Sequence, residues 1–131
     1  MQVRDEKTEN RQPVILFADD DEMCLDVSVQ MLQRLGYTIL EARDGKEAIK
    51  VYENNKDRVD LVILDMRMPY NGGHTFEQLR KINADLKIII TSGYTKDYGV
   101  RELEKQGCNG FLQKPFDVKV LSQKIRDALN N

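Results

Sequence analysis

The sequence predicts a single doubly wound α/β domain, in which helices cover both faces of a parallel sheet. Three observations support this fold class. Five short apolar runs are spread along the 131 residues, helical patterns separate them in strict alternation, and most of the runs are continuously apolar. Continuous apolar runs are typical of strands that are covered on both faces, as the strands of a parallel sheet are.

The five apolar runs are rich in Val, Ile, Leu or Phe and have the length of strands. Because crossovers between parallel strands are right-handed, strict alternation with helices builds a doubly wound sheet. We expect a flavodoxin-like order, 2-1-3-4-5, with five strands and five helices. The predicted strands are Val14–Ala18, Tyr37–Ala42, Leu61–Leu64, Leu86–Thr91 and Gly110–Leu112.

Apolar residues at helical spacing predict the five helices. Asp44 and Asp117 are expected to cap the second and the last helix, and Gly36 to end the first. The fourth helix, about Lys96–Gln106, has the weakest pattern, because Gly99 costs about 1 kcal/mol relative to Ala inside a helix. The apolar residues of the other four helices are Met23, Val27, Met31 and Leu35, then Ala48, Ile49 and Tyr52, then Phe76, Leu79 and Ile82, and finally Val118, Leu121, Ile125 and Leu129, the last four expected to point inward.

Composition excludes several classes of protein. Charged residues make up 32% and hydrophobic residues 40%, as in ordinary globular domains. The net charge of −2 provides no basic field for nucleic acid or anionic lipid, so we expect no direct nucleic-acid partner. No apolar run approaches the roughly 18 residues of a membrane span, and no signal peptide is recognisable, so we expect no membrane insertion and a cytoplasmic location. Cys24 and Cys108 lack metal-site spacing and are expected to be small core residues.

The chain divides into a short charged segment and one domain. Residues 1–12 hold six charged side chains and, of the strongly apolar types after the initial Met, only Val3, which is typical of a flexible tail or a linker remnant. Pro13 then opens a domain over residues 13–131. We expect no output domain after the last helix, and the chain is either a single-domain protein or one domain of a longer one.

Carboxylates gather at the ends of the first and third predicted strands, which are neighbours in the predicted order. Asp19 and Asp20 follow the first strand, and Asp65 follows the third. Ligands bind at such strand ends, at the point where the strand order reverses. Two unit charges about 4 Å apart repel by roughly 4 kcal/mol at an effective dielectric near 20, so the cluster needs a cation or raised pKa values. Hard carboxylate oxygens suit Mg²⁺, whereas Asp21 is sufficiently explained as a helix cap.

Two further strand ends bring a hydroxyl and an ammonium group to the same edge of the sheet. Thr91 ends the fourth predicted strand, and Lys114 follows the fifth. A nucleophilic carboxylate, a divalent cation, an ammonium and a hydroxyl are the groups that phosphoryl transfer to a carboxylate needs. The residues therefore predict a phosphoryl-transfer site with Asp65 as the acceptor.

Four motifs, which follow one another along the chain, resemble those of the receiver domain of two-component response regulators, and the resemblance covers about residues 13–130. The resemblance implies that Asp65 accepts a phosphoryl group from a histidine kinase or a phosphotransfer protein. Asp20 and Asp65 would ligate Mg²⁺ directly, Asp19 would help through water, and the main-chain carbonyl of Arg67 would be another ligand. The motifs are Ile15-Leu16-Phe17-Ala18-Asp19-Asp20-Asp21-Glu22, Asp60-Leu61-Val62-Ile63-Leu64-Asp65-Met66-Arg67-Met68-Pro69, Ile90-Thr91-Ser92-Gly93-Tyr94 and Gly110-Phe111-Leu112-Gln113-Lys114-Pro115-Phe116.

The resemblance also implies a switch. Thr91 and Lys114 would bind the phosphoryl oxygens, and Thr91 and Phe111 would move together on phosphorylation. Phe111 as a static core aromatic is the alternative. The surface of the fourth helix, fifth strand and fifth helix would then change, which allows a downstream protein target and a phosphorylation-dependent dimer. Lys114–Pro115 is expected to be a cis peptide, and the motifs are similar to receivers of hybrid sensor kinases.

Three alternatives remain open from the residues. A degenerate receiver would act only as a protein-docking module, although its acceptor and metal positions are all filled. A phosphohydrolase with an Asp nucleophile would carry a second Asp at the position of Arg67. A dinucleotide-binding domain would need a Gly-rich turn where three aspartates stand. We therefore expect a phosphoacceptor that assists its own phosphorylation and dephosphorylation, not a multiple-turnover enzyme on external substrates.

Overall fold

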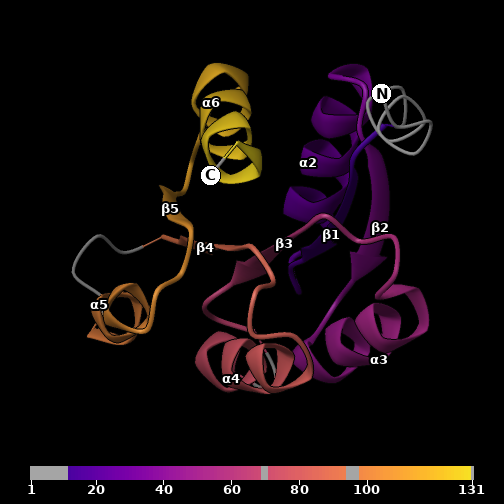
Figure 1. Ribbon diagram of the computed structural model, residues 1–131. Coiled ribbons are helices and arrows are strands. Elements are labelled where there is room, and N and C mark those ends of the chain that lie inside the picture. Colours follow the sequence, from indigo (N-terminus) through magenta and orange to yellow (C-terminus); the bar gives the residue numbers. More distant parts are fainter. Residues whose placement is uncertain (1–11, 69–70, 94–97, 131) are drawn as a thin grey trace.

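The sheet has five parallel strands in the order β2-β1-β3-β4-β5, as predicted (Figure 1). The computed structural model describes residues 12–68, 71–93 and 98–130. Five helices lie in the described part of the chain, and the predicted strands are each confirmed to within two residues at either end. The strands are β1 Val14–Ala18, β2 Thr38–Ala42, β3 Leu61–Asp65, β4 Ile88–Ser92 and β5 Gly110–Gln113; the helices are α2 Glu22–Arg34, α3 Gly45–Asn55, α4 Gly72–Ile82, α5 Tyr98–Lys105 and α6 Val118–Leu129.

Helices cover both faces of the sheet (Figure 1). α2 and α6 lie on one face, and α3, α4 and α5 lie on the other. Alternate residues of a strand point to opposite faces, so β1 sends Ile15 and Phe17 to the first layer and Leu16 to the second. Every residue of β1, β3 and β4 is buried, which explains why these strands read as continuous apolar runs.

The predicted helix ends are confirmed. The Asp44 carboxylate accepts from the N–H of Glu47 at 2.8 Å, and Asp117 accepts from the N–H of Val120 at 2.9 Å. Each cap satisfies an N–H group that has no partner within its own helix. Gly36 follows α2 with φ of +97°, the left-handed conformation that glycine adopts most easily.

The apolar stripe at four-residue steps correctly predicts α2, but it does not form the buried side of that helix. Met23 is 77% exposed and Val27 is 51% exposed, whereas Leu25 and Leu32 are buried against the sheet. Steps of four residues drift around a helix of 3.6 residues per turn, and α2 carries a second apolar row that packs better. The inward position expected for Val118 is also wrong, because this first residue of α6 is 43% exposed.

Among the described helices, none combines the length and apolar character that crossing a membrane would require. Cys24 and Cys108 are both half-buried free thiols.

Candidate functional site

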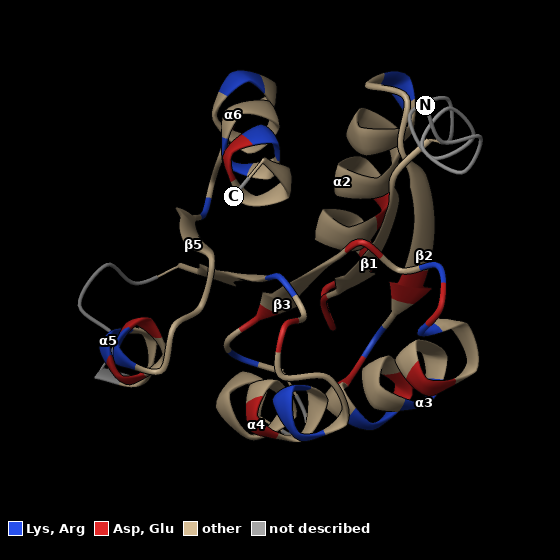
Figure 2. Cartoon of the chain, viewed as in Figure 1, with Lys and Arg blue, Asp and Glu red and all other residues tan. Residues whose placement is uncertain are grey.

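The predicted carboxylates meet at one edge of the sheet. β1 pairs with β3, so Asp19, directly after β1, and Asp65, the last residue of β3, reach the same edge. Carboxylate oxygens of Asp19, Asp20 and Asp65 lie within 4.8 Å of one another. Asp19 and Asp65 are buried, whereas Asp20 is exposed. Figure 2 shows acidic segments gathered where β1 and β3 end.

Lys114 supplies the positive charge between the two buried carboxylates. Its main-chain N–H donates to the carbonyl of Ser92 at 2.8 Å, which continues the pairing of β4 with β5. Its Nζ donates to Asp19 Oδ2 at 2.8 Å and lies 3.3 Å from Asp65 Oδ2. The Lys114–Pro115 peptide is cis, as predicted. Three carboxylates and one ammonium group leave the pocket with a surplus of negative charge.

The pKa values of the two buried carboxyl groups move in opposite directions. Burial is the main cause that raises the pKa of Asp65, to about 6 in all; the charge of Lys114 opposes this rise and the charge of Asp19 adds to it. Burial also opposes ionisation of Asp19, but hydrogen bonds from Lys114 and from the N–H of Asp21 lower its pKa overall. Lys114 binds Asp19 more closely than Asp65. Asp19 therefore ionises at a lower pH than Asp65, and Asp65 is the carboxyl group of the pair that is more easily protonated.

Cys24 also lies beside this pocket, a position that the sequence did not predict. Burial and a hydrogen bond to Asp19 raise the pKa of the Cys24 thiol to about 11, so the thiol stays protonated at neutral pH. Its S–H group therefore adds one more donor to the carboxylate of Asp19. The sequence signal is the cap of α2, because the Asp21 carboxylate accepts from the N–H of Cys24 and so places Cys24 in the first turn after Asp19.

Gly72 allows α4 to begin directly against the backbone that carries Asp65. A Cβ at Gly72 would lie 2.5 Å from the carbonyl oxygen of Asp65 and 2.8 Å from the Cα of Met66. The N–H of Gly72 donates to the carbonyl of Met66 at 3.1 Å. Only a residue without a side chain fits this contact without moving the segment after Asp65. The Gly72-Gly73 pair is visible in the sequence, but this contact is not.

The other predicted site residues lie around the pocket. Thr91 pairs with Asp65 across β3 and β4; it is buried, and its hydroxyl lies 3.5 Å from the carbonyl of Leu64. Arg67 is exposed, and its N–H donates to Asp65 Oδ1 at 3.3 Å. Phe111 is half-buried and packs on the α3–α4–α5 side of the sheet. The structure thus brings Thr91 and Lys114 to the acidic edge, with Phe111 in the neighbouring strand.

The arrangement suits a reaction in which Asp65 attacks a group that carries negative oxygens. Asp65 is a buried carboxylate with the Lys114 ammonium 3.3 Å away. The donor set of carboxylate oxygens, one of them exposed, fits a hard divalent cation such as Mg²⁺, which prefers oxygen ligands and keeps several waters. Fold and pocket together define a parallel α/β domain with an acidic, lysine-paired cluster at the carboxyl edge of its sheet.

The chain belongs to the response regulator receiver domain family, whose model matches residues 15–126. It is 37% identical over 116 residues to the sensor kinase CckA of Brucella abortus, covering 88% of this chain and 12% of that protein. It is 34% identical over 116 residues to the transcriptional regulatory protein GlrR of Escherichia coli, covering 88% of this chain and 26% of that protein. The chain therefore spans only a small part of these relatives.

Solved structures agree with this assignment. A receiver domain protein from Clostridium thermocellum superposes with a TM-score of 0.86 at 28% identity, covering 90% of this chain and 94% of the other. The response regulator TrrA of Thermotoga maritima, solved in complex with Mg²⁺ and beryllofluoride, superposes with a TM-score of 0.81 at 30% identity, covering 90% and 100%. The protein is thus a receiver domain of two-component signalling, and the dinucleotide-binding and phosphohydrolase alternatives are not favoured.

Proposed function

We propose that Asp65 is the phosphoacceptor of this receiver and that transfer to it depends on Mg²⁺. The observation that carries the proposal is the position of Lys114, whose ammonium bridges Asp19 and Asp65 at 2.8 and 3.3 Å. Asp19, Asp20 and Asp65 would hold the Mg²⁺, with the main-chain carbonyl of Arg67 as a further ligand. When bound, Mg²⁺ would neutralise charge on the transferring oxygens.

The chemistry is a displacement at phosphorus. A carboxylate oxygen of Asp65 forms a bond to phosphorus while the bond from phosphorus to the histidine nitrogen of the donor breaks. The electron pair of the broken bond returns to the imidazole. The Lys114 ammonium lies close enough to the acceptor oxygens to bind the oxygens of the new acyl phosphate, and the Thr91 hydroxyl would donate to another of them.

Phosphorylation by a small donor tests this assignment. With Mg²⁺, acetyl phosphate is expected to add one phosphoryl group to the wild-type chain, seen as a mass increase, and beryllofluoride is expected to bind. Asp65→Asn should do neither, and removal of Mg²⁺ by a chelator should abolish both in the wild type. Modification that persists in Asp65→Asn would refute Asp65 as the acceptor. A wild-type chain that takes no phosphoryl group would instead favour the degenerate docking module.

The histidine donor would dock on a mostly apolar groove beside the pocket. The groove has a volume of about 490 Å³ and runs between α2 and the segment that joins β5 to α6. Its lining includes the exposed Met23 and Val27 together with Lys114 and Phe116, so an occupant would come directly against the acceptor site. An amphipathic helix of the donor protein is the partner that such a groove fits, with its apolar side on Met23 and Val27.

Val27→Glu is expected to slow phosphotransfer from a histidine donor about tenfold, because it places a charge in the groove, whereas acetyl phosphate should react as with the wild type. Rapid-quench measurement of transfer from a purified histidine kinase or phosphotransfer protein checks this. Val120→Glu is the matched control, since Val120 is 45% exposed and does not line the groove. Equal slowing by both variants would contradict the docking site.

The signal would leave through the surface of α5, β5 and α6, by way of Thr91 and Phe111. Thr91 lies in β4 and Phe111 in β5, and their strands pair directly, which supports communication between them. The domain would act once per phosphorylation and assist its own dephosphorylation, without turning over external substrates. A phosphorylation-dependent dimer through the same surface is part of this proposal.

A further inference from the structure

Arg80 on α4 joins three segments of the fold. Its Nε donates to the carbonyl of Leu86 at 2.8 Å, just before β4. One of its terminal nitrogens donates to the carbonyl of Gly107 at 3.1 Å and to Asn109 Oδ1 at 3.0 Å, both between α5 and β5. The guanidinium also lies over the ring of Phe76, 4.7 Å from its centroid. The planar donor group of arginine is suited to such multiple contacts.

The segment that Arg80 holds directly follows the C-terminal end of α5. The N–H of Gly107 donates to Glu104 at 3.1 Å and the N–H of Cys108 donates to Leu103 at 3.0 Å, which closes the helix in a Schellman-type turn. Asn109 then pairs with Ile88 in both directions, donating to its carbonyl at 2.7 Å and accepting from its N–H at 2.8 Å. This end of α5 is thus tied to α4 and to the start of β4.

The other end of α5 is connected to the phosphoryl site. Tyr98, the first residue of α5, follows Thr91 by seven residues along the chain. α5 itself is short, spanning eight residues or about 12 Å, and within it Val100 and Leu103 are buried. Along the chain, a displacement of Thr91 would reach α5 from its N-terminal end, whereas Arg80 holds the segment that follows the C-terminal end.

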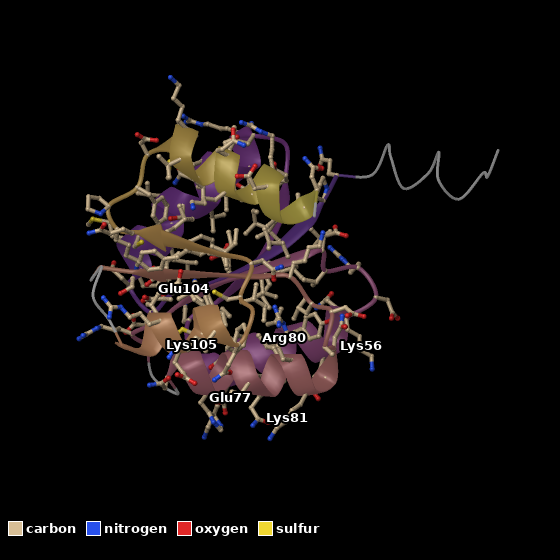
Figure 3. The ribbon with its side chains drawn as sticks, turned by 60° about the vertical axis from the view of Figure 1, so that its left-hand side comes forward. Lys56, Glu77, Arg80, Lys81, Glu104 and Lys105 are labelled. Carbon is tan, nitrogen blue, oxygen red and sulfur yellow. The ribbon has the colours of Figure 1, made fainter. Side chains whose placement is uncertain are left out.

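We propose that Arg80 is the fixed point about which α5 pivots when the receiver is phosphorylated. The proposal rests on the proposed function, because phosphorylation at Asp65 supplies the displacement. Translation of the whole helix would break the hydrogen bonds of Arg80 to Gly107 and Asn109, both of which come from a charged and partly buried donor. A pivot keeps these bonds, moves the N-terminal end most, and leaves β5 in register with β4. Figure 3 shows Arg80 on α4 close to the chain that leads from α5 to β5, whereas Lys81 points away.

Hydrogen exchange measured by mass spectrometry, with and without Mg²⁺ and beryllofluoride, tests the pivot. In the wild type, exchange is expected to change several-fold over residues 98–101 and less than about twofold over residues 106–110. In Arg80→Gln, amide exchange over residues 106–110 should rise about tenfold without ligand, and beryllofluoride should then alter both ends of α5. Lys81→Gln is the matched control, as an exposed neighbour on the same helix, and should behave as the wild type.

The outcomes separate the pivot from the proposed function. Fluorine NMR reports whether beryllofluoride binds; if it does not bind to the wild type, the proposed function and the pivot both fail. If it binds but exchange changes equally at the two ends of α5, or if Arg80→Gln leaves residues 106–110 unchanged, the pivot alone is wrong. Arg80→Lys keeps the positive charge but loses the planar, multiple-donor group; it is the milder variant, expected to raise exchange over the same residues should Arg80→Gln fold poorly.

Discussion

Lys114→Met is expected to lower the free energy of unfolding by about 3 kcal/mol at neutral pH without Mg²⁺. Methionine has a similar length but no charge, so the variant leaves Asp19 and Asp65 facing one another without their cation. Asp19 is completely buried, and its carboxylate has the Lys114 ammonium 2.8 Å away. Removing one partner of a buried ion pair is costly because the remaining charge stays in a medium of low dielectric. The lower end of the usual range applies, because the Lys114 side chain is 23% exposed.

Urea unfolding with and without Mg²⁺ checks this expectation. A divalent cation would replace the missing positive charge, so Mg²⁺ is expected to stabilise Lys114→Met more than it stabilises the wild type. Lys119→Met provides the control, because Lys119 is exposed on α6, and should change the stability by no more than about 0.5 kcal/mol. If the two variants lose equal stability, Lys114 does not neutralise the pocket as described.

Asp65→Asn is expected to raise the free energy of unfolding by about 2 kcal/mol at neutral pH without Mg²⁺. The pKa of Asp65 is raised from 3.8 to about 6, so the folded state favours the neutral carboxyl group and resists its ionisation. Asparagine keeps the size of the side chain and removes the charge. The Asp65 carboxylate thus lowers the stability of the fold that contains it, which is common at sites whose residues serve function rather than stability.

The difference in stability between Asp65→Asn and the wild type is expected to grow as the pH rises. Well below pH 3.8, Asp65 is protonated in both folded and unfolded chains, and the variant should match the wild type. As the pH rises toward 6, the unfolded chain ionises first and the wild type loses stability; above that pH the full difference is present. Urea unfolding across this range measures it, with the exposed Asp57→Asn as a flat control. A difference that does not grow with pH would show that burial does not oppose ionisation of Asp65.

Most of the fold could be predicted because burial in a parallel sheet leaves a direct trace in the sequence. β1 and β3 are covered on both faces, and their residues are accordingly apolar without alternation. The side that α2 presents to the sheet could not be predicted in the same way. Two apolar rows lie on that helix, and only the packing of Leu25, Val29 and Leu32 decides between them.

The site was predictable to the level of strand ends but not of contacts. Strand order alone brings Asp19 and Asp65 to one edge. The bridge from Lys114 to both carboxylates depends on the path of the segment after β5, which no local pattern encodes. The contact of Gly72 with the backbone of Asp65 likewise depends on how closely α4 approaches β3.

The bridge made by Lys114 has a consequence for how the protein is synthesised. The hydrogen bond from Lys114 to Asp19 joins residues 95 positions apart, near the two ends of the domain. During translation, the carboxylates of β1 and β3 emerge long before the ammonium that balances them. An N-terminal fragment that ends before residue 114 therefore contains the carboxylates that repel one another but not the ammonium group that neutralises them. The native arrangement of this edge can form only once β5 and Lys114 have been synthesised.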